Sequence, residues 1–383
     1  MDKPTVQDIF HRFYPAYLDQ YSPSPVQAKV AHNIMNCKTG AYGANVCVCE
    51  DCGFVQIHYN SCRNRCCPMC QAVPKEMWMD ARREDVLDAP YFHLVFTVPN
   101  ILNPVIYSNQ RLLYDALYHA ASSTISELTA DPKHLGAKVG YICILHTWGS
   151  EMNFHPHIHT ILLGGGLASN NQWKDNGENF FLPIRVISKM FRGKYLEELK
   201  RLWEEDKLVF HGTAEKFRNH YTFKELLDSC YGMDWIPHCK KTFNGAQTVI
   251  KYLGKYTHRI AVSNHRIVRM DDDTVTFLVK DYRNEGQWKE LTISGVKFVR
   301  RFLMHVPPRR FVRIRHYGLL CSRTKSQKLT LCRNLLGCKK YLSKLRDMEM
   351  PEILEHLYGI KVCVCKACGG HLGKPQMRMP LRC

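Results

Sequence analysis

The chain lacks the features that would assign it to a membrane or to the cell exterior. None of its apolar runs approaches the roughly 20 residues that a membrane-spanning helix needs. The first residues, MDKPTVQDIFHRFY, lack the order of a signal peptide, in which basic residues precede apolar ones. The 18 cysteines therefore indicate thiols of a reducing compartment rather than the disulfides of an exported protein. We expect an intracellular protein.

Two catalytic motifs are missing as well. The sequence contains no GxxxxGK[ST] loop, which would cradle the phosphates of ATP. It also contains no His-Glu-x-x-His helix motif, which a zinc hydrolase built on the histidines would need. A zinc hydrolase is therefore disfavoured.

Of the 383 residues, 45% are hydrophobic and 23% are charged, which is typical of a globular chain with two or three domains.

Acidic residues are absent from one long tract. Between Lys297 and Arg346 the chain has 15 lysines and arginines and no aspartate or glutamate, within a net charge of +18. Such a tract predicts a surface for a polyanion, and nucleic acid is favoured over a membrane because no basic amphipathic helix precedes an anchor. The aromatic residues within it are candidates for core packing or for base stacking. The arginines that we expect to contact DNA are Arg300, Arg301, Arg309, Arg310, Arg313 and Arg315.

The patterning along the chain predicts a mixed α and β protein. Apolar residues at helical spacing predict helices near 1–36, 75–87, 110–129, 186–205 and 246–258. Runs rich in β-branched and aromatic residues predict strands near 91–98, 140–147, 157–163 and within 266–294. We expect a helical segment at 1–36, a zinc-binding domain at 37–72, a catalytic core at 90–300, a basic DNA-binding region at 301–360 and a C-terminal zinc ribbon at 361–383.

The first cysteine-rich stretch has the spacing of a zinc ribbon. Two Cys-x-x-Cys pairs, Cys49 with Cys52 and Cys67 with Cys70, can each hold one side of a tetrahedral zinc ion. A redox dithiol would not explain two such pairs. We therefore predict that the two pairs share one zinc ion.

The remaining cysteines leave further sites open. Cys37 and Cys62 remain for a second zinc ion, with Cys66 or His32, or they are ordinary buried thiols. The C-terminal stretch CVCKACGGH predicts another zinc site at Cys365 and Cys368, and its completing ligands would be Cys363, His371 or Cys383. None of these sites has the open coordination position that catalysis requires, so we expect them to be structural.

A strand that carries histidines predicts a different kind of metal site. In NFHPHIHTILLGGG, His157 and His159 point to the same face of a strand and Ile158 points to the other. Two imidazoles on one face favour a divalent ion, and by softness alone they prefer zinc or manganese to magnesium. We rank His155 first as the third ligand because it is close in the sequence. The other candidates are His146, Glu151 and Gln247.

A pair of tyrosines offers a nucleophile. In GAQTVIKYLGKYTHRIAVSN, Tyr252 and Tyr256 lie four residues apart, so a helix would bring both hydroxyls to one face. Lys251, Lys255 and Arg259 surround them with positive charge and are further candidates for DNA contact. The alternative is a pair of tyrosines that only pack at an interface between helices.

These stretches together resemble the rolling-circle insertion-sequence transposases of bacteria, of the two-tyrosine HUH endonuclease type. CKTGAYG, CEDCG and SCRNRCCPMCQ resemble the zinc-binding domain of this family, and HTWGSEMNFHPHIHTILLGGGL resembles its histidine motif. YLGKYTHRIAVSNHRI resembles its tyrosine motif, and RIRHYGLL resembles a further family block. The resemblance spans nearly the whole chain and departs at Cys66, where the family often has histidine or another residue.

The resemblance implies a fold and an activity. The fold would be α+β, with a ferredoxin-like HUH nuclease core built on an antiparallel sheet and flanked by small zinc-binding modules. Mg²⁺ or Mn²⁺ at His157 and His159 would polarise a phosphate of single-stranded DNA, and Tyr252 or Tyr256 would attack it to form a 5′-phosphotyrosine. The partners would be the element ends and the target DNA, in the cytoplasm of a bacterium and associated with its nucleoid. The alternative is a non-catalytic zinc-finger regulator derived from such an element.

Overall fold

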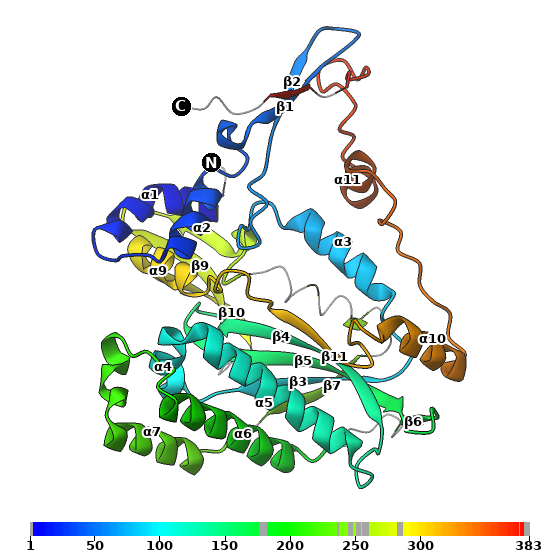
Figure 1. Ribbon diagram of the computed structural model, residues 1–383. Helices are drawn as coiled ribbons and strands as arrows, with labels where there is room; N and C mark the ends of the chain where they lie inside the picture. Colours follow the sequence, from blue (N-terminus) through cyan, green and yellow to red (C-terminus); the bar gives the residue numbers. More distant parts are fainter. Residues whose placement is uncertain are drawn as a thin grey trace.

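A single antiparallel sheet organises the centre of the molecule. The computed structural model describes residues 3–175, 182–235, 237–243, 248–249, 254, 260–281, 286–374 and 376–378. The sheet has six strands in the order β11-β4-β5-β3-β7, and β6 pairs with β5. The strands are β3 (Tyr91–Thr97), β4 (Lys138–Trp148), β5 (Phe154–Leu167), β6 (Trp173–Asp175), β7 (His238–Phe243) and β11 (Ile314–Gly318). Figure 1 shows helices on both sides of this sheet.

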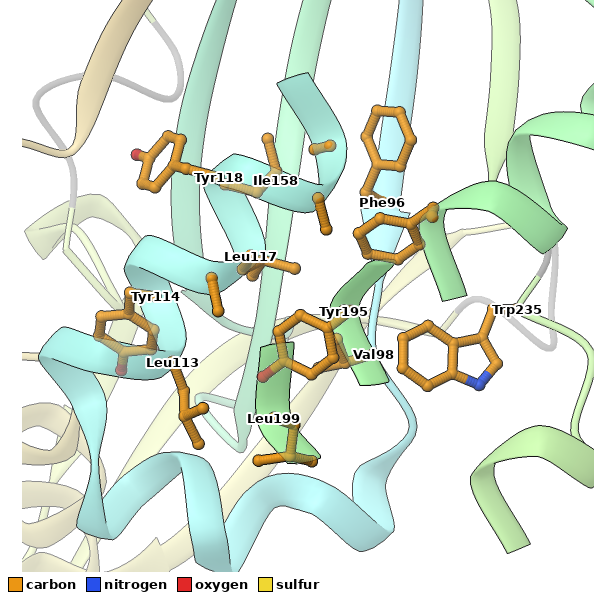
Figure 2. Packing of buried hydrophobic residues seen from close by; sticks show 14 of the residues in the cluster. Phe96, Val98, Leu113, Tyr114, Leu117, Tyr118, Ile158, Tyr195, Leu199 and Trp235 are labelled. Carbon is orange, nitrogen blue, oxygen red and sulfur yellow. The ribbon is translucent and has the colours of Figure 1, made fainter. Parts of the chain in front are cut away.

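One face of the sheet packs on a large helical layer. Ile158 and Leu162 of β5 point to this face, as alternation along a strand requires, and both are buried in the main core. Figure 2 shows Ile158 close to Leu117 and Tyr118. The helices of the layer are α4 (Asn103–Ser108), α5 (Gln110–Ala130), α6 (Ile184–Glu204) and α7 (His220–Gly232).

The opposite face of the sheet carries a smaller core. Ile161 of β5 and Ile142 of β4 pack there with Met79 and Leu329. Met79 belongs to α3 (Ala72–Arg83) and Leu329 belongs to α10 (Lys325–Leu336), and both helices lie on this side of the sheet. Only three positions of the helix expected near 246–258 are described as helical, Thr248, Val249 and Gly254, and the rest lies outside the described residues.

A second core joins the N-terminus to a small sheet. Thr5 and Ser24 each close a capping box, so two separate helices form where one helical segment was expected. Phe10 of the first helix packs edge-on against Phe302, at 5.2 Å between ring centroids. The elements of this core are α1 (Val6–Leu18), α2 (Pro25–Met35), β8 (Ile267–Met270), β9 (Thr274–Asp281), β10 (Gln287–Ser294) and α9 (Gly295–Met304).

A third, smaller sheet brings the two ends of the chain together. Strand β1 (Ala44–Val48) pairs with β2 (Val55–Tyr59) on one side and with β12 (Gln376–Arg378) on the other. The segment that leads to β12 contains α11 (Met350–Tyr358). The C-terminal stretch thus completes a sheet that the N-terminal hairpin begins (Figure 1).

The α+β prediction is confirmed by this mixture of helices and antiparallel sheets. Within the described part of the chain, no helix combines the length and the apolar character needed to cross a membrane.

Candidate metal centres and active site

Three histidines converge on the face of the central sheet opposite the large helical layer. His157 and His159 lie two residues apart on β5, and His146 lies directly across from His157 on β4. The nitrogen atoms that these three residues offer all lie within 4.8 Å of one another. The Nε2 atoms of His157 and His159 are 3.0 Å apart. Two nitrogens bound at a right angle to an ion about 2.1 Å away would be separated by about 3 Å, so the donor set fits a divalent metal.

Hydrogen bonds orient two of these rings for metal binding. The Nδ1 atom of His157 is 2.7 Å from the carbonyl oxygen of His155. A carbonyl only accepts, so Nδ1 carries the proton and Nε2 keeps its lone pair for a metal. On the other ring, Nδ1 of His159 is 2.8 Å from Nε2 of His93, a buried residue of β3. His93 was not singled out from the sequence, where only its place within the apolar run FHLVFTV is visible.

Burial keeps His157 and His159 neutral. It is the largest cause that lowers the pKa of His157 to about 3 and that moves the pKa of His159 well below its ordinary value. The neutral imidazole is the form that binds a metal ion. The site is therefore ready to bind a metal ion at neutral pH without first losing a proton.

The third histidine of the group is His146, whereas His155 ranked first from the sequence. His155 does not belong to the group, and its Nδ1 atom lies 3.3 Å from Oδ1 of Asn100. The reason is geometric, because residues paired across two strands have Cβ atoms about 5 Å apart, whereas His155 and His159 are four residues apart along one strand. Glu151 is not in the group either, and Gln247 lies outside the described residues.

The structure describes few positions of the tyrosine motif. Tyr252 and Tyr256 lie outside the described residues, as do Lys251, Lys255 and Arg259. Val249 is buried in the same small core as Ile161 of β5, on the face that carries the histidines.

A second described position within the motif agrees with this location. Gly254 is buried, and a side chain there would collide with Sδ of Met79 on α3. Both described positions that flank Tyr252 therefore pack on the histidine side of the sheet.

The cysteines form two groups, and neither is the group expected from spacing. Cys37, Cys62, Cys67 and Cys70 form the inner cysteine cluster, in which the sulfur atoms of Cys62 and Cys70 are 3.8 Å apart. Cys66 is not a member. Two members of the inner cysteine cluster, Cys37 and Cys67, are buried in the second core, so apolar packing supports this cluster as well.

The outer cysteine cluster combines opposite ends of the chain. It consists of Cys49, Cys52, Cys365 and Cys368. The prediction that Cys49 and Cys52 share an ion with Cys67 and Cys70 is therefore wrong. Spacing defines which two cysteines lie on one turn, but the fold decides which two turns meet.

The predicted DNA-contacting arginines divide into two kinds. Three are engaged within the fold. Arg301 donates to the carbonyl of Glu151 at 2.7 Å, Arg315 pairs with Asp115, and burial lowers the pKa of Arg313.

The other three arginines are exposed. The guanidinium of Arg300 lies 4.9 Å from the ring centroid of Tyr21. Arg309 and Arg310 line a hollow in the surface together with Lys29 and Arg65. Lys29 and Arg65 lie far from the acid-free tract in the sequence, so the sequence alone did not indicate them as DNA-binding residues.

Comparison with known proteins identifies the family. Residues 140–328 match the family described as "Putative transposase", and residues 9–98 match the family described as "Transposase zinc-binding domain". A curated "Putative transposase y4qJ" of Sinorhizobium fredii is 40% identical over 95% of this chain and 93% of its own length. The "Transposase for insertion sequence element IS801" of Pseudomonas savastanoi pv. phaseolicola is 30% identical over 79% of this chain and 72% of its own length.

Among solved structures, the conjugative relaxase TrwC, in complex with oriT DNA and free of metal, covers 47% of this chain and 67% of its own chain, with 15% identity and a TM-score of 0.23. The curated relatives and the two family matches, one of them to the zinc-binding domain, agree with each other. The chain belongs to the IS91 family of insertion-sequence transposases.

Proposed function

We propose that this transposase nicks and rejoins single-stranded DNA at the ends of an insertion sequence through a 5′-phosphotyrosine intermediate. The observation that carries the proposal is the group of His146, His157 and His159, on the face of the sheet where the described positions Val249 and Gly254 also pack. A transposase acts on DNA, and we infer that Tyr252 and Tyr256 supply the nucleophiles that act with this metal-binding face.

The chain's residues can divide the metal-binding work as follows. His146, His157 and His159 would hold Mg²⁺ or Mn²⁺, and His93 would fix the orientation of His159 through the 2.8 Å hydrogen bond. The ion, when bound, polarises the scissile phosphate. Three imidazoles and no carboxylate favour Mn²⁺ over Mg²⁺ by ligand softness. The proposal therefore replaces His155 with His146 as the third ligand.

The covalent step conserves the energy of the phosphodiester bond. The hydroxyl oxygen of Tyr252 or Tyr256 attacks phosphorus, and a bond from tyrosine oxygen to phosphorus forms as the bond from phosphorus to the 3′ oxygen breaks. The tyrosine proton leaves to solvent, and the 3′ oxygen leaves as a hydroxyl. A later attack by a 3′-hydroxyl on the phosphotyrosine reverses the exchange and joins DNA to DNA, so no ATP is consumed. Two tyrosines would allow two strands to be held in sequence.

The exposed basic residues provide a path for the DNA backbone. Lys29, Arg65, Arg309 and Arg310 surround one hollow, and such a group would contact phosphates. Binding through phosphates releases counterions, so affinity should fall steeply as salt rises. The arginines held inside the fold, such as Arg315, should contribute to stability instead.

The decisive experiment is a test for covalent attachment. A 5′-labelled and a 3′-labelled single-stranded oligonucleotide from the element's end would be incubated with the protein and Mn²⁺ or Mg²⁺, and then separated under denaturing conditions. We expect an adduct that carries the label located 3′ of the nick, because the tyrosine retains the 5′ phosphate. Tyr252→Phe with Tyr256→Phe should abolish it. Tyr221→Phe is the matched control, since Tyr221 is 76% exposed on α7, in the helical layer on the opposite face.

Two further comparisons decide between outcomes. His146→Ala should lower adduct formation far more than His155→Ala, and the reverse result would restore His155 as the ligand. Binding of the end sequence without any adduct, at every metal tested, would contradict the proposal and favour a non-catalytic DNA-binding regulator.

A further inference from the structure

Two short turns at opposite ends of the chain have the same construction. CEDCG at Cys49 and CKACG at Cys365 each place two cysteines before a glycine. The glycines, Gly53 and Gly369, have φ values of 70° and 77°, and the N–H of each donates to the carbonyl of the first cysteine at 3.0 Å. Glycine adopts this conformation without the strain that a side chain would bring. Each turn therefore presents two sulfur atoms on one side.

The four sulfur atoms have the separation of ligands around a metal ion. Sγ of Cys49 lies 3.5 Å from Sγ of Cys368, and Sγ of Cys52 lies 3.8 Å from Sγ of Cys365. A tetrahedral zinc ion with bonds of about 2.3 Å would separate its sulfur ligands by about 3.8 Å. A disulfide would bring two of them to about 2.05 Å. The arrangement fits four thiolates around one zinc ion and does not fit a disulfide.

Apolar packing around these four sulfur atoms is sparse. Among the residues that the structure describes, the apolar cluster around the sulfurs contains only Cys47, Cys49, Cys365 and Leu372, whereas Ile57 on the adjacent β2 is 51% exposed. Hydrogen bonds do connect the two ends, because the N–H of Gly373 donates to Val48 at 2.9 Å and the N–H of Glu50 donates to His371 at 3.1 Å. Such a small cluster contributes little stability by apolar burial, and small folds of this kind commonly depend on a bound metal ion.

We propose that Cys49, Cys52, Cys365 and Cys368 bind a single zinc ion that closes the C-terminal arm, residues 338–374, onto the N-terminal hairpin. The matched zinc-binding domain covers residues 9–98 and so contains only half of this ligand set. The ligands Cys52 and Cys365 are 313 positions apart in the sequence. The proposal stands independently of the nicking mechanism, since none of these cysteines is near the histidines in the sequence or in the sheet order.

The near end of the arm has a separate anchor that needs no metal. Asp80 of α3 accepts hydrogen bonds from the hydroxyls of Tyr341 and Ser343, both at 2.6 Å, and from the N–H of Leu345 at 2.9 Å. Figure 1 shows the chain passing from this point through α11 to the small sheet of β1 and β2. With the zinc ion in place, the arm is held firmly at both ends. Without it, the far end keeps only the backbone hydrogen bonds to the N-terminal hairpin, whereas the anchor at Asp80 is unchanged.

Zinc content tests whether one ion is shared. The full-length protein would be purified as wild type, as Cys49→Ser/Cys52→Ser, as Cys365→Ser/Cys368→Ser, and as the quadruple variant, and zinc per chain would be measured by mass spectrometry. We expect each double variant to lose one zinc ion and the quadruple variant to lose the same single ion. The loss of two ions by the quadruple variant, or of none by either double variant, would overturn the proposal. Cys363→Ser is the matched control, because this exposed neighbour lies outside the cluster.

Proteolysis tests whether the ion closes the arm. Cys49→Ser/Cys52→Ser changes only the N-terminal half of the site, yet it should speed tryptic cleavage at Lys361 and Lys366 at the other end of the chain by at least tenfold. Unchanged cleavage there would overturn the closure. Should the serine variants fail to fold, Cys365→His keeps four ligands, and its cobalt-loaded form should show a shifted absorption band rather than none. A band identical to that of the wild type would show that Cys365 does not bind the ion.

Discussion

The histidine centre and the outer cysteine cluster both gather metal ligands, but the protein around them differs greatly. His157 and His159 lie on β5, which has strands on both sides and an apolar core on each face. Cys49 and Cys365 lie in a cluster of four buried residues at the edge of the molecule. The histidines are therefore held in position by the fold, whereas we propose that the cysteines depend on a zinc ion for their position.

This difference agrees with the roles that we propose for the two metal ions. A catalytic centre must keep its ligands in place while substrate enters and leaves, so a rigid sheet suits it. A structural site can leave the positioning to the metal, because nothing exchanges there. The inner cysteine cluster lies between these cases, since Cys37 and Cys67 are also part of the second core.

Removal of zinc should give the largest effect and should separate the two regions. Structural zinc supplies about 10–16 kcal/mol in small metal-dependent folds. After treatment with a strong chelator, we expect amide protection to be lost in β1, β2 and residues 362–374, and to be kept in β3, β4 and β5. Hydrogen exchange read by mass spectrometry would check this. Retained protection in β1 and β2, or equal loss in β4 and β5, would contradict the comparison.

A matched pair of substitutions should give the next largest effect. Ile158 is fully buried beneath α5 (Figure 2), whereas Ile57 on β2 is 51% exposed. Ile158→Ala should lower the free energy of unfolding by about 2–5 kcal/mol because it leaves a cavity. Ile57→Ala should change it by less than about 0.5 kcal/mol. Urea unfolding followed by circular dichroism would measure both, and similar values for the two variants would show that the cores are not as unequal as described.

A smaller effect is expected from the residue that supports the histidine centre. His93→Gln should weaken Mn²⁺ binding by about 10–100-fold, because residues that orient metal-bound histidines contribute that much to affinity. The 2.8 Å hydrogen bond to Nδ1 of His159 is the basis. Isothermal titration calorimetry would measure the affinity. His119→Gln on the exposed surface of α5 is the control, and equal affinities of the two variants would remove His93 from the site.

Features that depend on local pattern could be predicted from the sequence. Alternation along NFHPHIHTILL predicted the strand and the shared face of His157 and His159, which the register of β5 confirms. The Cys-x-x-Cys turns were likewise visible, because two residues of spacing bring both sulfurs to one side. Apolar periodicity and the two pairs of capping residues are equally local, and they account for α1 and α2.

Features that depend on distant pairing could not be predicted. The partner of Cys49 and Cys52 depends on which strand β1 pairs with, and nothing near β1 in the sequence encodes β12. His146 belongs with His157 only because β4 and β5 are paired in one register, and His93 enters from a third strand.

A count of charges along the sequence likewise cannot show which arginines are available to bind DNA. The acid-free tract does not reveal that Arg301 and Arg315 are occupied by Glu151 and Asp115. The roles of Tyr252 and Tyr256 stay predictions, because these residues lie outside the described part of the chain.

The smallest effect concerns the acid sensitivity of the second core, which arises from a buried histidine. His305 is buried with its Nε2–H donating to the carbonyl of Met152 at 3.0 Å and its Nδ1 3.1 Å from Oγ1 of Thr147. Burial lowers the pKa of His305 to about 4. The ordinary pKa of about 6.5 applies in the unfolded chain. The unfolded chain therefore binds more protons below pH 6.5, and stability is complete above that pH and falls as the pH approaches 4.

From pH 7 to pH 5.5, His305 alone should cost about 1 kcal/mol of unfolding free energy. His305→Gln keeps an N–H donor for Met152 but cannot be protonated, so this variant should lose less stability than the wild type over the same interval. Urea unfolding at the two pH values, with zinc present throughout, gives the difference between the two proteins. An equal loss in both would mean that His305 is already protonated at pH 5.5 in the folded chain, and that the second core admits more water than its packing indicates.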